Sequence, residues 1–561
     1  MNATLPTPMT RSLRLLGMVI SALLLVPLIG VFSSVFVGDQ GAWAHLSSTV
    51  LPGLAANSLM LASGVAVGVA IIGTLTAWLT ANHDFPGRRL LEWMLILPLA
   101  IPAYVLAYTY TDVLQFAGPV QTFLRESFGW QKQDYWFPEI RSLGGAVAML
   151  TFALYPYVYV IARVAFLEQS TTLNEAARNM GLSAFSVFTR ISLPLARPAI
   201  VAGVALALME TLADYGTVSY FGVPTFTTGI FNAWFSQGDR IAAAKLAVIL
   251  MGFVILVMLL EHWARRRARF HQTVGRRHVR TVLSGARGWS ATLLCALPIV
   301  VGFALPALIL LKLALTEGDV QFGARFVKLA ANSFGVAAIT ALIATSAALL
   351  LAYVARSSGR RTQAWLNRLV GLGYAIPGTV IAVGVLIPLI ALDHFLVDSI
   401  AAIFGFTTGL ILTGGFLVLI YAYLIRFLAV ALQSVEAGLS KITLNMDDAA
   451  RSLGAKPIEV MRDVHMPLLR TSLITAGLLV FVDVLKELPA TLVMRPFNFD
   501  TLAVQTYNLA MDERLAEAST AALVIVAVGL IPLIMASLAI TRPQAYTAVD
   551  IDPAMSLSTR S

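Results

Sequence analysis

Two short clusters of ionisable side chains interrupt apolar stretches of the chain, and they are spaced alike. Glu210 and Asp214 lie four residues apart, as do Asp483 and Glu487, so the second pair repeats the spacing of the first. Residues four apart share one face of a helix, so each pair is predicted to present two carboxylates together. Charges in an apolar run are costly and usually face a cavity or a partner, which suggests a central acidic path for a cation. A position at the outer mouth, or a structural ion pair with Lys486, explains the same residues equally well.

Tyrosine and proline mark two further features of the apolar stretches. Tyr104 and Tyr108 lie in a tyrosine-rich region and could line a path, although interfacial belts account for most tyrosines of membrane proteins. Pro102 and Pro377 each follow an Ala-Ile dipeptide deep in an apolar run. Proline frees a carbonyl and allows a helix to kink, so both positions are candidate gates. Packing of the helices alone would also explain them.

The sequence excludes several kinds of catalytic centre. It contains no Gly-x-x-x-x-Gly-Lys-Ser/Thr loop for binding phosphates and no His-Glu-x-x-His zinc motif. The single cysteine, Cys295, excludes a disulfide framework and a cysteine-ligated metal cluster. We therefore predict no enzymatic activity, no cofactor and no stable metal site in this chain.

A longer duplication is found at 174–198 and 446–470, where every matched position is separated from its partner by the interval that separates Glu210 from Asp483. The matched residues are Glu175, Ala176, Ala177, Gly181, Leu193 and Pro194 in the first copy, and Asp448, Ala449, Ala450, Gly454, Met466 and Pro467 in the second. An acidic residue with alanines favours a short helix, glycine ends it, and proline opens the next element. Each copy is thus predicted to be a compact polar helix-turn-helix suited to docking a partner. Ordinary capped loops are the plainer interpretation.

Composition places most of the chain in lipid. Hydrophobic residues make up 58% and charged residues only 12%, against about 25% charged in soluble domains. A membrane-spanning helix needs about 20 apolar residues, and twelve stretches qualify. They are 14–36, 55–81, 90–115, 144–167, 199–221, 241–263, 289–313, 331–355, 367–392, 401–432, 472–494 and 518–540. The predicted fold class is an all-α polytopic membrane protein.

Basic residues predict the orientation of these spans. Arg88, Arg89 and Arg178 lie in loops that alternate with loops nearly free of basic residues, such as 37–54 and 222–240. Lys and Arg in short loops favour the cytoplasm, so both termini and both duplicated loops are predicted to be cytoplasmic. The net charge of +9 is therefore taken as an orientation signal. We expect no nucleic-acid partner, because no soluble domain is present to carry a basic patch.

Six spans per copy make the two repeats parallel, related by an axis along the membrane normal. Asn57-Ser58 recurs as Asn332-Ser333, which extends the duplication beyond the loops. The predicted divisions are a first half at 1–263, an arginine-rich cytoplasmic linker at 264–288, a second half at 289–541 and a cytoplasmic tail at 542–561. The linker has eight arginines and no acidic residue, so we expect it to contact anionic lipid headgroups.

The duplicated loops resemble the E-A-A loop of bacterial importer permeases of the ATP-binding cassette class, which seats in a groove of the ATPase subunit. In this resemblance Glu175 and Asp448 take the acidic position, and Gly181 and Gly454 the bend. The resemblance implies a type I importer fold in the bacterial inner membrane, with two copies of a cytoplasmic ATPase and a periplasmic substrate-binding protein as partners. ATP and Mg²⁺ would be bound by that ATPase, since this chain has no phosphate-binding loop. The aspartate of the second copy departs from the usual glutamate but keeps the charge.

Three stretches look most like permeases for ferric iron, namely Leu97–Tyr104, Glu210–Val218 and Lys486–Leu492. This resemblance implies that two fused halves pass ferric iron by alternating access. Ferric ion is a hard cation that prefers oxygen donors, which carboxylates and phenols supply. Thiamine, aminoethylphosphonate and polyamines remain alternative substrates. A secondary transporter driven by a gradient can also have parallel six-span halves, but the paired loops argue against it.

Overall fold

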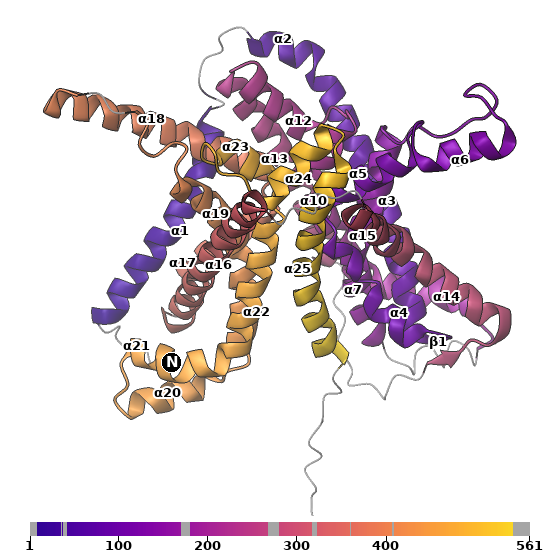
Figure 1. Cartoon of the computed structure of the whole chain (residues 1–561). Helices are drawn as coiled ribbons and strands as arrows, with labels where there is room; N and C mark the ends of the chain where they lie inside the picture. The colour runs from indigo at the N-terminus through magenta and orange to yellow at the C-terminus, as the bar shows by residue number, and fades with distance from the viewer. Residues whose placement is uncertain are drawn as a thin grey trace, which may run out of the picture.

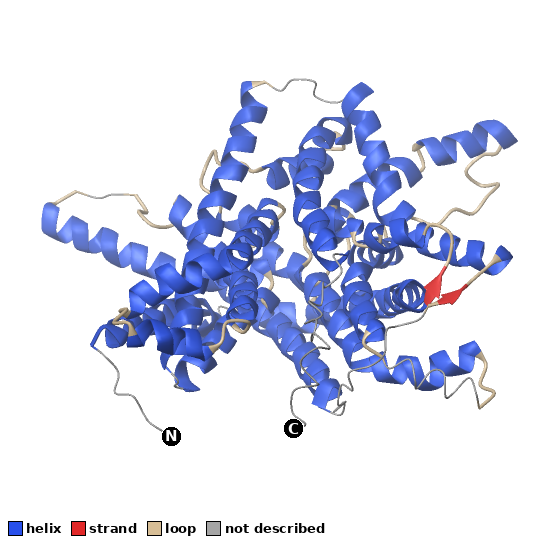
Figure 2. Cartoon of the chain, turned by 90° about the horizontal axis from the view of Figure 1, so that it is seen from below, coloured by secondary structure: helices blue, strands red, loops and turns tan. Residues whose placement is uncertain are grey.

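The structure is a computed structural model that describes residues 8–34, 36, 42–169, 180–266, 280–316, 323–358, 361–406 and 409–541. These residues are helical almost throughout, with one short pair of strands at the edge of the molecule in Figure 2. Eleven of the described helices are long and apolar enough to cross a membrane, or twelve if one bent pair is a single span. The predicted all-α polytopic fold class is confirmed.

The order of elements repeats along the chain. The first half contains α1 (Pro8–Ser34), α2 (Ala42–Thr49), α3 (Leu51–Asn82), β1 (His83–Asp84), α4 (Arg88–Met94), η1 (Leu97–Ala100), α5 (Ala103–Leu114), α6 (Pro119–Phe128), α7 (Leu143–Leu167), α9 (Ala184–Val187), η2 (Phe188–Ser192), α10 (Leu193–Ala213), α11 (Gly216–Tyr220), α12 (Phe226–Phe231), η3 (Asn232–Ser236) and α13 (Arg240–Arg266). The second contains β2 (Thr281–Val282), α14 (Gly285–Ile299), η4 (Val300–Ala304), α15 (Leu305–Thr316), α16 (Ala324–Ser358), α17 (Arg361–Gly371), η5 (Leu372–Ala375), α18 (Gly378–Phe404), α19 (Phe416–Leu439), α20 (Leu444–Ser452), α21 (Pro457–Glu459), η6 (Val460–His465), α22 (Met466–Leu485), α23 (Pro489–Met494), α24 (Leu502–Met511) and α25 (Leu515–Thr541). The starts of α3 and α16, of α7 and α19, and of α10 and α22 are separated by one constant interval, which is that of the duplicated loops.

The two candidate gate prolines break their helices completely, where a kink was predicted. A 3-10 turn ends one residue before Ile101 and Ile376, the isoleucine is extended, and Pro102 or Pro377 precedes a new helix. The residue before a proline avoids the helical region, which explains why both copies break here. The spans predicted at 90–115 and 367–392 are therefore wrong as continuous helices. The helical segments before and after the first break meet at 92°.

Other predicted spans are displaced for similar local reasons. The spans expected at 199–221 and 472–494 are helices α10 and α22, which end at Ala213 and Leu485. The span expected at 401–432 is divided, because α18 ends at Phe404 and α19 begins at Phe416. Gly405 ends α18 with a φ of +73°, a conformation that glycine adopts without strain.

The first and last spans of each half pack against the other half, which no sequence pattern predicted. Helix α1 packs on α16, α17 and α18 and α13 packs on α18, whereas α15 packs on α5 and α25 packs on η1. Of two hydrophobic cores, one joins α13 of the first half to α16, α18 and α19, and the other joins α25 to α3, α5 and α7. Figure 1 shows the result as two leaning groups of helices, with α10, α24 and α25 between them. The halves are therefore interlocked rather than merely adjacent.

The repeated Asn-Ser dipeptides make the same contacts in both halves. The Asn57 and Asn332 side chains donate to the carbonyls of Pro224 and Asp500, at 3.0 and 3.1 Å. The hydroxyls of Ser58 and Ser333 accept from the backbone amides of Phe226 and Leu502, at 3.2 and 2.7 Å. Each dipeptide thus fastens a long span to the short helix α12 or α24.

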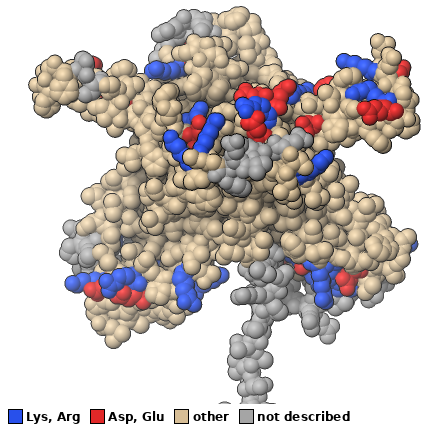
Figure 3. All heavy atoms as spheres, in the orientation of Figure 1, with Lys and Arg blue, Asp and Glu red and all other residues tan. Residues whose placement is uncertain are grey.

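On the visible face of the molecule (Figure 3), charged side chains lie at two levels. On the face shown in Figure 3, Lys, Arg, Asp and Glu gather near the upper and lower ends, and the waist between them shows almost none among its described atoms. Helices α4 and α20 and the strand β1 lie at the lower end in Figure 1, and the arms formed by α6 and the end of α18 project from the upper part. An uncharged band of this kind is suited to the hydrocarbon layer of a membrane.

Candidate functional site

The acidic residues singled out from the sequence meet in one cavity between the two halves. Its volume is about 120 Å³. Its lining consists of Pro102, Tyr104, Glu210, Asp214 and Gly216 from the first half and Tyr374, Arg426, Phe427, Asp483, Lys486, Glu487, Leu488 and Pro489 from the second. Four carboxylates therefore face two basic groups, which leaves an excess of two negative charges when all are ionised.

Two of the four carboxylates also stabilise the chain where a helix breaks. Asp214 follows the end of α10 and accepts from the amides of Thr217 and Val218 in α11, at 3.1 and 3.2 Å. Glu487 follows the end of α22 and accepts from the amides of Ala490 and Thr491 in α23, at 2.9 and 3.0 Å. The prediction that each acidic pair shares one face of a continuous helix is therefore wrong. The pairs meet because the helix breaks between their members.

The other two carboxylates are held by ion pairs. Lys486 Nζ lies 2.9 Å from Asp483 Oδ1, so the structural pair considered from the sequence is present for this acid. Arg426 Nη2 lies 3.6 Å from Glu210 Oε2, and Arg426 Nη1 lies 3.7 Å from Glu487 Oε1. Arg426 is thus the one side chain of the cavity lining that forms ion pairs with carboxylates from both halves.

Not every candidate reaches the cavity. Tyr104 lines it, whereas Tyr108 is buried in the first half with its ring 4.4 Å from that of Tyr220. Pro102 lines the cavity, whereas Pro377 does not, although a Cβ atom added at the next residue, Gly378, would lie 2.7 Å from Glu487 Oε1. The described residues contain no cluster of three His, Cys, Asp or Glu side chains arranged to hold a metal ion.

Sequence reasoning missed Arg426 and Tyr374 in this lining. Arg426 lies in an apolar run, so the criterion that selected Glu210 applies to it equally. It has no ionisable counterpart at the equivalent position of the first half, where Ala153 stands, and a search guided by the repeat passes over it. Tyr374 has Leu99 as its counterpart in the first half, so the repeat does not mark it either.

The second duplicated loop folds as the sequence predicts for its local structure. Asp448, Ala449 and Ala450 lie in α20, which ends before Gly454, and this glycine has a φ of +88°. The chain then passes through α21 and the π-helical turn η6 into α22, where Pro467 occupies the first turn. Asp448 and Ala449 are exposed, so this helix presents its acidic and small residues at the surface.

A buried polar cluster fastens this loop to α16. Asp447 accepts from Arg356 Nε at 2.8 Å, and His465 Nε2 lies 2.8 Å from the same carboxylate. Arg356 also donates to the carbonyls of Leu439 and Ile442, at 2.8 and 2.9 Å. Asp447 is therefore the acidic residue that fixes the loop, and its neighbour Asp448 is left facing outward.

The first duplicated loop is described only in part. Glu175, Ala176 and Ala177 lie outside the described residues. Gly181 has a φ of +83°, and the π-helical turn η2 leads into α10, which begins at Leu193 with Pro194 in its first turn. The bend glycine, the π-helical turn and the proline in the first turn of the next helix therefore occur in both loops.

An exposed apolar side chain directly precedes the bend glycine in each loop, a feature that the sequence analysis did not use. Met180 is 75% exposed and Leu453 is 89% exposed, and the two occupy equivalent positions of the duplication. Each loop therefore has an exposed apolar side chain at its bend.

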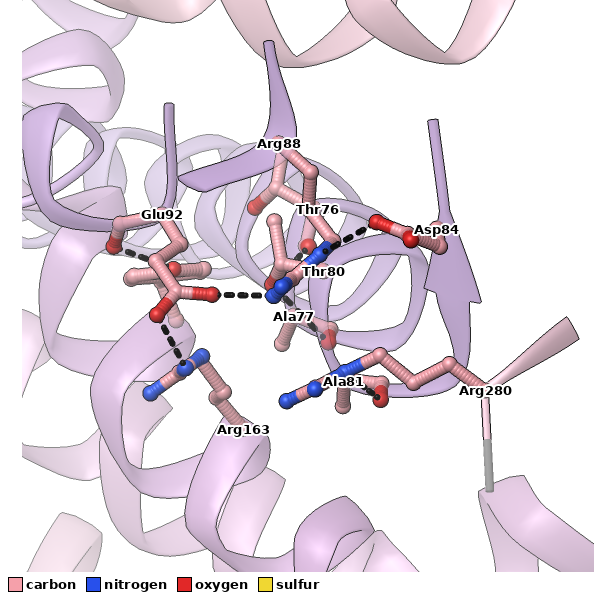
Figure 4. Close-up of polar contacts among 10 residues, drawn as sticks. Thr76, Ala77, Thr80, Ala81, Asp84, Arg88, Glu92, Arg163 and Arg280 are labelled. Carbon is pink, nitrogen blue, oxygen red and sulfur yellow. Dashed lines mark hydrogen bonds and ion pairs between the residues drawn. The ribbon is translucent and has the colours of Figure 1, made fainter. Parts of the chain in front are cut away.

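A second polar network surrounds β1 and α4, which lie at the same lower end of the molecule in Figure 1, and its contacts are drawn in Figure 4. Arg88 forms ion pairs with Asp84, at 3.0 Å, and with Glu92, and Arg163 Nη2 lies 3.2 Å from Glu92 Oε1. The corresponding residues of the second half form a network without arginine, in which Gln363 donates to Asn367 and Asn367 donates to Glu436. Arg88 and Arg163, which the orientation rule treats as plain positive charges, are thus part of the packed structure.

The end of the arginine-rich linker is fastened to this network. Arg280 Nε donates to the carbonyl of Ala81 at 3.2 Å, and the adjacent strand β2 pairs in parallel with β1. Burial, and then the nearby Arg88, lowers the pKa of the Arg280 guanidinium. Arg280 therefore contacts protein at the end of α3, whereas linker residues 267–279, where headgroup contacts were also expected, lie outside the described residues.

Comparison with known proteins agrees with the duplicated architecture. The family described as "Binding-protein-dependent transport system inner membrane component" matches twice, at residues 70–270 and 344–543. The Fe(3+)-transport system permease protein FbpB 2 of Haemophilus influenzae is 25% identical over 86% of this chain and 89% of its own length. The molybdenum transport system permease protein ModB of Escherichia coli is 29% identical over 35% of this chain and 86% of its own length. The sulfate transport system permease protein CysT of Salmonella typhimurium is 29% identical over 36% of this chain and 72% of its own length.

The lengths of these matches fit the repeat, because ModB aligns over most of its own length with about a third of this chain. The long helices are suited to a membrane, and the duplicated loops, the two family matches and the ferric permease relative agree with one another. The chain therefore belongs to the binding-protein-dependent transport system inner membrane component family, as a non-enzymatic, multi-pass permease subunit of an ATP-binding cassette importer with two family domains in one polypeptide.

Proposed function

We propose that this permease translocates ferric iron, delivered by a periplasmic binding protein, across the bacterial inner membrane by alternating access. The observation that carries the proposal is the acidic cavity between the halves, where four carboxylates exceed two basic groups. Hard, highly charged cations prefer such oxygen donors. The name of the Haemophilus influenzae relative supports the same substrate.

The energy would come from two copies of a cytoplasmic ATPase that bind ATP and Mg²⁺. Each copy would dock on one duplicated loop, with Met180 or Leu453 inserted in its groove and Glu175 or Asp448 at its rim. Both loops, both chain ends and the linker would then face the cytoplasm. Because α21, after the Gly454 bend, continues through the π-helical turn η6 into α22, a movement of the second loop would be transmitted along this continuous helix to the cavity.

The division into halves at 1–263 and 289–541, joined by the linker at 264–288 and followed by a tail at 542–561, remains part of this proposal. Two interlocked cores fit a rocking motion in which each half carries the outer spans of the other. Pro102 and Pro377 lie at matching breaks beside the cavity and would act as its hinges. The motion transports the substrate only if the substrate binds the outward-open and inward-open states with different affinity.

Uptake of radioactive iron by cells that express the whole transporter tests the proposed substrate. Glu210→Gln and Asp483→Asn should each lower uptake by about tenfold or more, since one charge lost beside a trivalent ion in a partly buried site is worth over ~1.4 kcal/mol. Neither carboxylate caps a helix break, so assembly should be unchanged. Glu513→Gln, in an exposed pair with Arg141, is the matched control and should transport normally.

Competition with iron uptake distinguishes ferric iron from the alternative substrates. Thiamine, a polyamine, aminoethylphosphonate, molybdate or sulfate in excess should leave iron uptake unchanged. Inhibition by one of them, with iron uptake insensitive to Glu210→Gln, would assign the cavity to that compound and refute the iron proposal. Uptake that persists without the ATPase and follows a proton gradient would indicate a secondary transporter.

A further inference from the structure

Arg426 occupies a position in the cavity that the acidic residues alone do not explain. Its side chain is only 8% exposed, and its guanidinium lies between Glu210 of α10 and Glu487 at the end of α22. These two carboxylates belong to different halves. A single cation therefore connects the halves at the point where the path must open.

The backbone opposite Arg426 is shaped to admit it. A Cβ atom on Gly378 would lie 2.7 Å from Glu487 Oε1 and 3.0 Å from Arg426 Nη1, so no larger residue fits without displacing the pair. In the first half the position equivalent to Gly378 holds Ala103, and the position equivalent to Arg426 holds Ala153. The glycine thus occurs in the half that has the arginine. The backbone around Arg426 is therefore adapted to hold the ion pair between Arg426 and Glu487.

The contacts of Arg426 are loose compared with the neighbouring pair. Its distances of 3.6 and 3.7 Å to the two carboxylates exceed the roughly 2.7–2.9 Å of a tight charge-assisted hydrogen bond. Lys486, in contrast, lies 2.9 Å from Asp483. Arg426 Nε makes no hydrogen bond within the described part of the chain. Arg426 therefore neutralises two carboxylates without being bound tightly to either.

We propose that Arg426 is the resident counter-cation of the translocation path, which joins the halves while the cavity is empty and which a multivalent cation must displace. This inference rests on the proposed function only in assuming a cationic cargo. A trivalent ion bound by Glu210 and Glu487 repels the guanidinium, so occupancy of the site breaks the link between the halves. Cations of low charge compete poorly with Arg426, which makes this residue a determinant of selectivity.

Binding of Tb³⁺, a trivalent ion that seeks oxygen ligands, tests the inference on the purified full-length permease in lipid nanodiscs. Tyr104 and Tyr374 line the cavity and can sensitise the luminescence of the ion. Arg426→Gln should raise the affinity for Tb³⁺ by about tenfold or more, because it removes a competing charge. Arg426→Lys keeps the charge on a single ammonium that cannot span both carboxylates, so it should give a smaller increase.

Arg141→Gln removes an arginine from an exposed pair at the surface and should leave the affinity unchanged. Equal affinity in wild type, Arg426→Gln and Arg426→Lys would overturn the inference, as would weaker binding in either Arg426 variant. If Arg426→Gln fails to fold, Arg426→Lys alone decides, since wild-type affinity in that variant contradicts a bridging role. Molybdate that binds the wild type and is lost in Arg426→Gln would also overturn it, by making Arg426 a ligand for an anion.

The iron proposal and this inference fail separately. If cells take up no iron but Tb³⁺ affinity rises in Arg426→Gln, the substrate is another cation and the counter-cation role stands. If iron is taken up and Tb³⁺ affinity does not change, Arg426 is only a structural link.

Discussion

Replacing Gly181 and Gly454 together with valine is expected to abolish co-purification of the ATPase while the permease still inserts in the membrane. Both glycines have a positive φ, +83° and +88°, which costs an ordinary residue about 1–2 kcal/mol and a β-branched residue more. A Cβ atom would meet nothing within 4 Å at either position, so the effect comes from the backbone and not from a clash. The bend would open, and Met180 and Leu453 would no longer be presented on the tip of each loop.

The chain offers a matched control for this experiment. Gly129 and Gly405 also have a positive φ, +67° and +73°, and also have open space around the added Cβ, but they lie on the arms at the other end of the molecule. The Gly129→Val and Gly405→Val double variant should retain the ATPase. Normal co-purification with the Gly181→Val and Gly454→Val variant would rule out docking through these bends.

Asp447→Asn is expected to destabilise the second loop by about 3–5 kcal/mol, the usual cost of removing one partner from a buried ion pair. The substitution leaves Arg356 and His465 facing a neutral amide in a cluster that is almost closed to solvent. Burial by itself would raise the pKa of the Asp447 carboxyl, but the hydrogen bonds from Arg356 and His465 outweigh it and hold that pKa below its usual range. The contribution to stability is therefore complete above the ordinary carboxyl pKa and is lost as the pH falls through the lowered value.

Hydrogen exchange across 444–466, measured at neutral pH and after acidification, checks this expectation. Faster exchange should appear in Asp447→Asn at neutral pH, and in the wild type only after acidification. Asp463→Asn is the control within the same loop, because Asp463 pairs with Arg462 on the exposed surface, where ion pairs contribute little. Unchanged exchange in Asp447→Asn would show that the cluster does not hold the loop in place.

The local structure of the duplicated loops was the part of the site most predictable from sequence, because glycine, proline and small residues directly affect the backbone. The sequence predicts that glycine ends the first helix of each loop, and at this point Gly181 and Gly454 have a left-handed conformation. For Ile101-Pro102 and Ile376-Pro377, the sequence predicted correctly that the helix is disrupted. It did not predict the type of disruption, because proline alone does not distinguish a kink from a break.

The interlocked cores could not be predicted, because an apolar span does not specify which apolar neighbour it packs against. From the sequence, helices α1 and α25 are expected to pack within their own halves. In the structure, α1 belongs to the hydrophobic core of α16, α18 and α19, and α25 belongs to the core of α3, α5 and α7. Only part of the cavity lining could be predicted from the sequence. Its acids carry a repeated spacing, but Arg426 and the room that Gly378 leaves for it emerge only when the two halves are brought together.

Labelling of single cysteines with a membrane-impermeant maleimide tests the central claim, that two alike loops face the cytoplasm and receive the ATPase there. Met180→Cys and Leu453→Cys would be compared in a Cys295→Ala background, with Phe123→Cys and Phe404→Cys as controls on the exposed arms at the other end. We predict that both loop cysteines react in inverted vesicles, that neither reacts in spheroplasts, and that bound ATPase protects both. Reaction of either loop cysteine from outside the cell would contradict the account.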